Sequence, residues 1–153
     1  MATKICFAAS SGGHLEEIAR LRDLAKKYDS FLFTEKSNFQ ELNMCDKIYY
    51  VSQINRKEPL FLVKFFTLWF KSLYILAKER PSCIISTGAL ATYPICIIGF
   101  MMRIKIIYIE SFARVDSPSL TGKLMYKFAD LFIVQWEEML KVYPKSKYGG
   151  GIF

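Results

Sequence analysis

The chain has 153 residues, of which 52% are hydrophobic and 23% are charged, and its net charge at pH 7 is +7. This length and apolar content suffice for one well-buried domain and are too small for two ordinary ones, so we expect a single domain over residues 1–153. The apolar run near the start, Ile5 to Ala9, is too short for a signal peptide or a membrane span, and we therefore expect a cytoplasmic protein.

The excess of positive charge lies in the middle of the chain. Residues 56–114 hold nine basic and three acidic side chains, whereas the segments on either side are nearly balanced. The sign of the charge is compatible with nucleic acid, anionic lipid or a phosphorylated substrate. Aromatic residues near the basic ones alternate at helix spacing with Leu and Val, which is typical of buried helices and not of base-stacking platforms. We therefore predict no nucleic-acid partner.

The cysteines are predicted to be buried and reduced. None of them has the spacing of metal ligands, and three lie inside apolar runs. We predict neither a metal site nor a cofactor. The four residues are Cys6, Cys45, Cys83 and Cys96.

Short β-rich runs alternate with helical patterns, which is typical of a parallel sheet covered by helices on both faces. Most of the runs are continuously apolar, as buried parallel strands require. Pro59, Pro94 and Pro118 stand where helices are expected to begin. Ser117 would cap the last of these helices. The predicted fold class is a doubly wound, Rossmann-like α/β domain, with strands over Lys4–Ala9, Ser30–Thr34, Lys47–Val51, Ser82–Ser86, Ile106–Ile109 and Leu131–Val134.

The turn after the first predicted strand is SSGGH (10–14), and it contains the only histidine of the chain. Backbone N–H groups in such a turn, together with the positive end of the following helix, favour anions. We therefore predict that Ser11, Gly12 and Gly13 bind a phosphate group. The G-x-G-x-x-G motif is absent, although Glu35 stands where a ribose-binding acid belongs, so NAD binding is the weaker alternative.

His14 has two interpretations. A lone histidine often caps a helix or packs beneath a loop, and that structural role is one alternative. Its place at the first strand-to-helix turn of an open α/β sheet, where ligands bind, favours a catalytic base or a phosphate donor. The turn after the fourth predicted strand brings Thr87 and Gly88 to the same edge, and we predict that they also bind phosphate.

A third polar segment follows the fifth predicted strand directly. It begins with Glu110 and Ser111, and Arg114 follows within one helical turn. The carboxylate would take a proton or orient His14, and the arginine would bind phosphate with its fork of donors. An ion pair between Glu110 and Arg114 that only holds the loop is an equal alternative. We predict His14 and Glu110 as catalytic residues, and Ser111 and Arg114 as phosphate-binding residues.

An amphipathic helix is predicted over residues 58–81. Its lysines recur every seven residues and form one narrow polar edge. The rest of its surface is apolar over about 200°, twice the stripe that a helix needs to cover a sheet. Burial on two sides is one interpretation, and the other is a face in the lipid interface with lysines reaching anionic head groups. A membrane span is excluded, because a lysine near the bilayer centre costs about 2.5 to 3.5 kcal/mol. The predicted membrane-facing residues are Lys64, Phe65, Trp69, Lys71 and Lys78.

Several strings of the sequence, taken in order, are similar to one known family. They are SSGGHL (10–15), STGA with Pro94, YIESFARVDSPSLTGKLMY (108–126), ADLFIVQWEEM (129–139) and the closing YPKSKYGGGIF. They resemble the small polysaccharide-biosynthesis subunits that include the membrane-recruiting subunit of the two-chain N-acetylglucosaminyltransferase of the dolichol pathway. Bacterial capsule and exopolysaccharide glycosyltransferase subunits belong to the same group. The resemblance spans essentially the whole chain.

The resemblance implies an amino-terminal, acceptor-side half of a GT-B glycosyltransferase, with a second chain that binds the UDP-sugar. The reaction would transfer a sugar to a polyprenyl-diphosphate-linked saccharide in capsule or exopolysaccharide synthesis. Eukaryotic members carry an amino-terminal membrane anchor that this sequence lacks, so we expect the domain itself to lie peripherally on the inner face of the cell membrane. Two alternatives stay open, a non-catalytic enhancer that docks a complete glycosyltransferase and a stand-alone nucleotide-binding module.

Overall fold

The apolar runs of the sequence form the strands of one parallel sheet. The computed structural model describes residues 3–36, 43–55 and 57–152. Within them the strands lie in the order β3-β2-β1-β4-β5-β6-β7, and every neighbouring pair is parallel. The strands are β1 (Lys4–Ala9), β2 (Asp29–Glu35), β3 (Lys47–Val51), β4 (Cys83–Gly88), β5 (Lys105–Ile109), β6 (Leu131–Val134) and β7 (Lys147–Tyr148).

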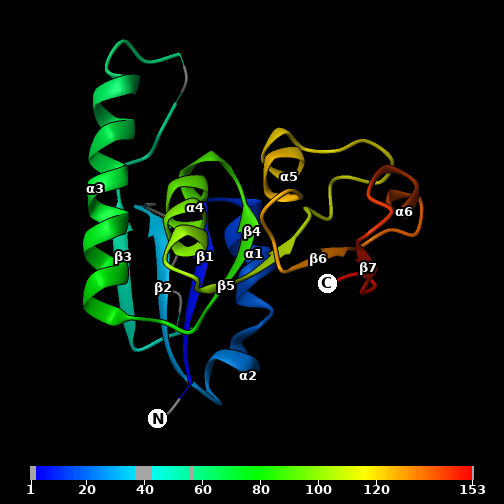
Figure 1. Ribbon diagram of the computed structural model, residues 1–153, viewed down its shortest axis with the longest axis horizontal. Coiled ribbons are helices and arrows are strands. Elements are labelled where there is room, and N and C mark those ends of the chain that lie inside the picture. Colours follow the sequence, from blue (N-terminus) through cyan, green and yellow to red (C-terminus); the bar gives the residue numbers. More distant parts are fainter. Residues whose placement is uncertain (1–2, 37–42, 56, 153) are drawn as a thin grey trace.

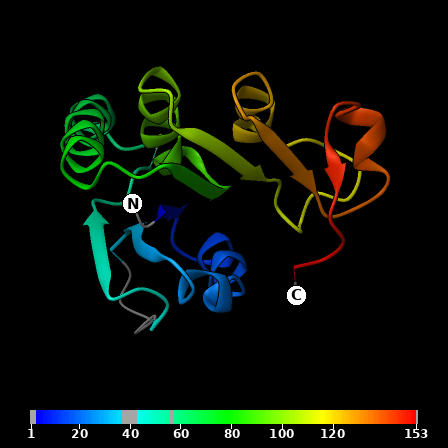
Figure 2. The same cartoon turned by 60° about the horizontal axis from the view of Figure 1, so that its bottom comes forward.

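Helices cover both faces of this sheet (Figures 1 and 2). They are α1 (Gly13–Ala19), α2 (Arg22–Ala25), α3 (Phe61–Glu79), the 3-10 turn η1 (Leu90–Thr92), α4 (Tyr93–Met101), α5 (Leu120–Met125) and α6 (Met139–Val142). Side chains of α1 and α2 pack on one face, and side chains of α3 to α6 pack on the other. Figure 2 shows the green to orange helices above the sheet and the blue helices beneath it.

Alternation along the strands divides the hydrophobic core into two clusters. In β1, Cys6 and Ala8 face the cluster of α3 and α4, whereas Ile5 and Phe7 face the cluster of α1. Successive side chains of a strand point to opposite faces, so a strand that is apolar at every position is one that is buried on both sides. This pattern confirms the predicted doubly wound α/β fold.

The predicted strands agree with β1 to β6, with ends that differ by at most two residues. The strand β7 was not predicted, because two residues are too few to give a pattern. The predicted cap of the helix after Pro118 was wrong: α5 begins at Leu120, and the Oγ of Ser119, not that of Ser117, accepts a hydrogen bond from the Gly122 N–H at 2.8 Å. All four cysteines are free thiols. Cys6 and Cys96 are buried as predicted, whereas the prediction was wrong for Cys45 and Cys83, which are half-buried.

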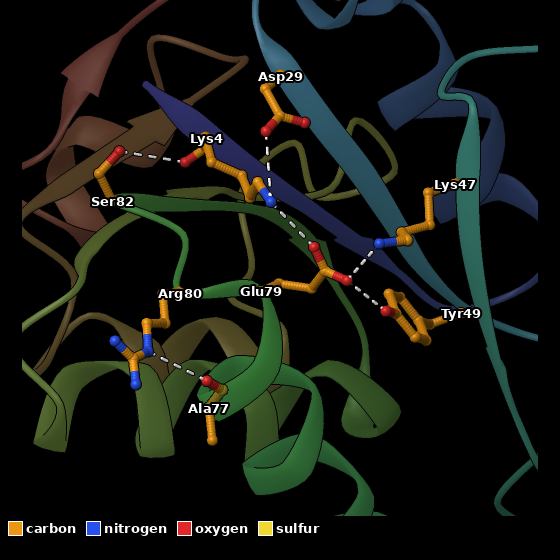
Figure 3. A network of polar contacts seen from close by, with 8 residues as sticks. All are labelled: Lys4, Asp29, Lys47, Tyr49, Ala77, Glu79, Arg80 and Ser82. Atoms are coloured by element: carbon orange, nitrogen blue, oxygen red, sulfur yellow. Dashed lines mark hydrogen bonds and ion pairs between the residues drawn. The ribbon is translucent and has the colours of Figure 1, made fainter. Parts of the chain in front are cut away.

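Glu79 fixes the carboxyl end of α3 to the sheet (Figure 3). Its side chain is 4% exposed and accepts hydrogen bonds from Lys4 Nζ at 3.1 Å, from Lys47 Nζ and from the Tyr49 hydroxyl. Burial alone would raise the pKa of Glu79, but these donors outweigh it and lower that pKa to about 2. The contacts join α3 to β1 and β3 near the amino ends of the strands. We call these four residues the Glu79 cluster.

Candidate functional site

Polar loops meet at the carboxyl edge of the sheet, between β1 and β4, where the strand order reverses. Ligands of open α/β sheets bind at such a reversal. The loops after β1, β4 and β5 line a cleft of about 310 Å³ there. Its wall includes His14, Ser111 and Arg114, so three of the predicted site residues share one cleft. We call it the His14 cleft.

The turn at Gly12 and Gly13 leaves room and hydrogen-bond donors for a ligand. Gly12 has a φ of 82°, in the region that favours glycine. Apart from the adjacent residues and the backbone of α1, no atom of the described residues lies within 4 Å of the position that a Cβ would take on either glycine. The backbone N–H groups of Gly12, Gly13 and His14 donate to no acceptor among the described residues. This turn is therefore suited to an anionic oxygen.

Ser11 is engaged by a carboxylate behind the turn. Its N–H and its Oγ both donate to Glu35 Oε2, at 3.2 and 3.1 Å. The other oxygen of Glu35 accepts from the Ile54 N–H at 3.0 Å. A contact between Ser11 and phosphate would require new partners for both donors, which leaves Gly12 and Gly13 as the open donors of the turn. Glu35 itself holds the loop, and these contacts do not favour the ribose-binding role considered for it.

Thr87 and Gly88 contact His14. The Oγ1 of Thr87, which is fully buried, donates to the His14 carbonyl at 2.8 Å. A Cβ on Gly88 would lie 3.4 Å from His14 Cε1 and 3.0 Å from the Tyr108 hydroxyl. The absence of a side chain at Gly88 thus lets the imidazole ring pack against the backbone. Its Nδ1 atom is buried and has no hydrogen-bond partner.

Glu17 is a site residue that the sequence analysis missed. It is 3% exposed, and its Oε1 accepts from Ser111 Oγ and from the Phe112 N–H, both at 3.0 Å. Its Oε2 is buried and has no partner. Burial raises the pKa of Glu17, although the two hydrogen bonds and the attraction of His14 oppose that rise. The available signal was its spacing, since residues i and i+3 share one face of a helix.

Glu110 organises the loop after β5. It is 1% exposed, and its carboxylate accepts four hydrogen bonds, which come from the Ser111 N–H, from the N–H and Oγ of Ser119 and from the Tyr143 hydroxyl. A Cβ on Gly122 would lie 2.0 Å from its Oε2, so this contact requires glycine. No hydrogen bond joins the Glu110 carboxylate to His14, and Arg114 forms no ion pair with it. Arg114 is exposed in the wall of the cleft.

A second cleft, of about 390 Å³, lies at the opposite edge of the sheet. Lys4, Asp29, Lys47 and Glu79 line it, and these charged groups pair with one another. The His14 cleft is smaller but contains polar atoms without partners, so we take it as the candidate site. Nowhere in the described ranges do three or more His, Cys, Asp or Glu side chains come together in a way that could hold a metal ion.

The helix α3 carries an exposed apolar face on its outer side. Phe65 and Trp69, which were predicted to face the membrane, are half-buried at its boundary, and Trp69 packs against the core. Lys71 donates to the Tyr50 carbonyl at 2.6 Å, Lys64 pairs with Glu58, and Lys78 lies 5.8 Å from the ring of Tyr74. The exposed face consists of Leu62, Val63, Phe66, Phe70, Leu73 and Tyr74. We call these six residues the outer face of α3.

Figure 1 shows α3 as the outermost helix, with its amino-terminal half extending past α4. That half follows β3, so it lies at the carboxyl edge of the sheet, as the His14 cleft does. Each helix in the described part of the chain is too short or too polar to cross a bilayer.

Comparisons with known proteins give a family and a fold. The family model "Oligosaccharide biosynthesis protein Alg14 like" matches residues 5–152. The UDP-N-acetylglucosamine transferase subunit ALG14 of Homo sapiens is 28% identical over 97% of this chain and 82% of its own length. The subunit of the same name from Yarrowia lipolytica is 24% identical over 92% of this chain and 64% of its own length.

Among solved structures, MurG of Acinetobacter baumannii matches with a TM-score of 0.71 and 11% identity over 89% of this chain and 42% of MurG. UDP-N-acetylglucosamine 2-epimerase of Rickettsia bellii matches with a TM-score of 0.77 and 12% identity over 99% of this chain and 46% of the epimerase. At such identities the likeness concerns the fold alone. The chain spans less than half the length of either solved protein.

Proposed function

Because this chain belongs to the Alg14-like family of oligosaccharide biosynthesis proteins, we propose that it is one subunit of a two-chain glycosyltransferase. The partner chain binds UDP-N-acetylglucosamine, and this chain binds a polyprenyl-diphosphate-linked saccharide as the acceptor. The relatives reported above are named as UDP-N-acetylglucosamine transferase subunits. These names support both the proposed sugar and the proposal that this chain is a subunit. They do not mention capsule or exopolysaccharide, and that context rests on the sequence resemblance alone.

The observation that carries the proposal is the His14 cleft. It brings an imidazole and an exposed guanidinium to the point where the strand order reverses, and the open glycine turn directly precedes this imidazole in the chain. Arg114 and the N–H groups of Gly12 and Gly13 would bind the diphosphate of the acceptor. This arrangement suits an anionic acceptor that reacts through a hydroxyl group.

In the proposed reaction His14 is the general base. Its neutral imidazole takes the proton of the acceptor hydroxyl while the hydroxyl oxygen bonds to the anomeric carbon of the sugar. The bond from that carbon to the diphosphate breaks, and UDP leaves with the electron pair. Glu110, the other candidate base, already accepts four hydrogen bonds. We propose that it holds Ser111 and Arg114 in position.

The outer face of α3 is proposed to rest on an anionic lipid bilayer at the cytoplasmic face of the membrane. Its exposed apolar side chains lie beside the edge formed by Lys64, Lys71 and Lys78, a combination typical of helices that lie in the lipid interface. Phe70 is 73% exposed, and burial in the interface would remove it from water. Because α3 projects from the same edge as the His14 cleft, docking would bring the cleft close to a lipid-linked acceptor.

The function is tested with the chain and its partner purified together. A tagged chain is used to capture the partner from detergent-treated membranes of its own source. Transfer from labelled UDP-N-acetylglucosamine to a polyprenyl-diphosphate-linked saccharide is then measured. We expect His14→Ala to lower kcat about 10² to 10⁴-fold without loss of the partner. Full activity of this variant would remove His14 from the chemistry.

The same assay separates the two alternatives. A partner that is inert alone supports a split enzyme, whereas a partner that is slow but active alone would make this chain an enhancer. Recovery of a monomer without a partner, with tight binding of UDP or NAD, would favour the stand-alone module.

Membrane docking is tested by flotation with vesicles that contain phosphatidylglycerol or only phosphatidylcholine. Replacement of Phe66 and Phe70 by Ala should lower binding to anionic vesicles at least tenfold, since each side chain gains about 1.5 to 3 kcal/mol on burial. The matched control is Tyr28→Ala, an exposed aromatic residue far from α3 in sequence. Equal loss in the control would refute a specific role of the outer face.

A further inference from the structure

We infer that Glu17 is the positioning residue of His14. Its free carboxylate oxygen accepts the Nδ1 proton of the imidazole, directly or through one buried water, so that the unprotonated Nε2 is the nitrogen available to the acceptor. This inference rests on the proposed function, in which His14 is the base. It assigns to Glu17, a buried acid of α1, the role of holding the imidazole of His14 in one tautomer.

The first observation is that two complementary atoms lack partners. Nδ1 of His14 and Oε2 of Glu17 are both buried and without a hydrogen bond. One is a donor when it carries the proton of a neutral imidazole, and the other is an acceptor. Buried polar atoms are rarely left unpaired, and a donor and an acceptor on neighbouring side chains of one helix face can satisfy each other after a small side-chain rotation or through one bound water.

The second observation is that the two side chains start from one face of the same helix. Glu17 follows His14 by three residues in α1, and residues at this spacing are neighbours on the helix surface. Their electrostatic attraction acts on Glu17. Gly88 lies against the Cε1–Nδ1 edge of the imidazole, with its Cβ position 3.5 Å from Nδ1, and Thr87 donates to the backbone carbonyl of His14, so these two residues hold the ring and its backbone in place.

The third observation is that the carboxylate of Glu17 is itself held in place. Its Oε1 accepts from Ser111 Oγ and the Phe112 N–H, both at 3.0 Å. These donors come from the loop after β5, which also lines the cleft. The loop therefore fixes the rotation of the carboxylate and leaves Oε2 as its only open oxygen.

This arrangement determines which imidazole nitrogen is the base. The nitrogen that carries the proton is set by the hydrogen bond that the other nitrogen makes. A carboxylate at Nδ1 keeps the proton there, leaves the lone pair on Nε2 and stabilises the imidazolium that forms when Nε2 takes a proton. Other ionisable groups nearby are Arg114 and Tyr108 in the cleft wall and Glu110, whose charge acts on Glu17.

Replacement of Glu17 by Gln makes a specific prediction. The side-chain oxygen of Gln must face Ser111 and Phe112, because both of these groups donate. Its NH₂ group then takes the place of Oε2 and can only donate. Nδ1 becomes an acceptor, and the imidazole proton moves to Nε2. Glu17→Gln should therefore reverse the tautomer of His14.

The tautomer is read from ¹⁵N NMR spectra of the full-length chain on the alkaline plateau of a pH series, where a further rise in pH no longer changes the imidazole signals. His14 is the only histidine, so a chain prepared without a histidine tag gives one set of imidazole cross-peaks, and the pattern of couplings from Hδ2 and Hε1 to the two nitrogens distinguishes the Nδ1–H form from the Nε2–H form. We expect the Nδ1–H form in the wild type and the Nε2–H form in Glu17→Gln. The matched control is Glu16→Gln, which removes the same charge from an exposed position of the same helix and should leave the spectrum unchanged.

Activity provides the second readout. In the two-chain transfer assay we expect Glu17→Gln to lower kcat about 10² to 10⁴-fold with little change in KM, because the reversed tautomer leaves Nε2 unable to take the proton of the acceptor hydroxyl. A wild-type chain in the Nε2–H form, or identical spectra for the wild type and Glu17→Gln, would overturn the inference, even where the variant does not fold well enough for the assay. Full activity of His14→Ala together with a reversed tautomer would instead remove the proposed base and leave the contact in place.

Discussion

The two edges of the sheet hold buried carboxylates in opposite situations. At the amino edge, both oxygens of Glu79 accept hydrogen bonds from Lys4, Lys47 and Tyr49, and its pKa is lowered to about 2. At the carboxyl edge, Glu17 has one oxygen without a partner, and burial raises its pKa. The negative charge of Glu79 is balanced by the lysines that contact it. Glu17, in contrast, has one carboxylate oxygen that accepts no hydrogen bond.

This difference distinguishes a group of residues that stabilises the fold, the Glu79 cluster, from one that serves the proposed reaction, at the His14 cleft. A buried polar atom without a partner costs about 1 to 3 kcal/mol, and such groups persist where the protein uses them. The Glu79 cluster joins α3 to two strands and leaves its own charges paired. At the His14 cleft, His14 Nδ1 in the wall and Oε2 of Glu17, three residues further along α1, are buried and unpaired, and the glycine turn that precedes His14 has open donors. Substitutions at the amino edge should therefore affect folding, and those at the carboxyl edge should affect transfer.

The largest effect on stability is expected for Glu79→Ala. We expect the free energy of unfolding to fall by about 2 to 3 kcal/mol, below the 3 to 5 kcal/mol of a fully buried pair, since the lysines regain contact with water. Urea unfolding followed by circular dichroism measures the change. The control is Glu58→Ala, which breaks the exposed pair with Lys64 and should cost at most about 1 kcal/mol. Equal losses of stability in the two variants would contradict the special role of Glu79. The transfer activity per folded complex should be the same in Glu79→Ala as in the wild type.

The same cluster should make stability depend on acid pH. The pKa of Glu79 is about 2 in the folded chain and 4.5 in its ordinary state, so its contribution is fully present above pH 4.5 and is lost as pH falls toward 2. The measurement is the difference in unfolding free energy between the wild type and Glu79→Ala at a series of pH values. Other groups titrate in both proteins and cancel. A difference that stays constant down to pH 2 would exclude this linkage.

Much of the fold follows from local sequence. The strands β1, β3 and β6 were predicted to the residue, because buried parallel strands are continuous apolar runs bounded by polar turns. The cap of α5 was assigned to Ser117 instead of Ser119, since both residues flank Pro118 and only the path of the loop decides between them. That path is fixed by Glu110, which both the N–H and the Oγ of Ser119 contact.

The parts that sequence did not predict depend on contacts between distant segments. Periodicity gave the width of the apolar arc of α3 but not the part of it that packs on the sheet, so Phe65 and Trp69 were assigned outward in place of Phe66 and Phe70. Glu17 resembled a solvated helix residue, because its partner Ser111 lies 94 positions away. The polar turns themselves were predictable, since parallel strands bring their carboxyl ends to one edge.

An intermediate effect on stability is expected for Gly122→Ala. This variant tests whether a buried carboxylate stabilises the fold because its oxygens are hydrogen-bonded or because of the edge of the sheet at which it lies. Glu110 lies at the carboxyl edge, yet its oxygens are all bonded, as those of Glu79 are. An alanine Cβ would lie 2.0 Å from Glu110 Oε2 and force the carboxylate to move, which should lower the free energy of unfolding by about 1 to 3 kcal/mol. Chemical denaturation of Gly13→Ala is the control, since no atom lies within 4 Å of that Cβ position. Equal stability of Gly122→Ala and the wild type would show that the carboxylate is not held as tightly as its contacts indicate.

The smallest effect, with the opposite sign, is expected for Glu17→Gln. Glutamine keeps the acceptor for Ser111 and Phe112 and replaces the contact to His14 by a donor, so the number of hydrogen bonds is preserved while a buried charge is removed. The folded pKa of Glu17 is raised, so the charged form opposes folding at pH 7, and the variant should gain up to about 1 kcal/mol in unfolding free energy. Thermal and urea unfolding at pH 7 measure this gain. A loss as large as that of Glu79→Ala would place Glu17 among the structural carboxylates, because a residue kept for function alone should leave the fold more stable when its charge is removed.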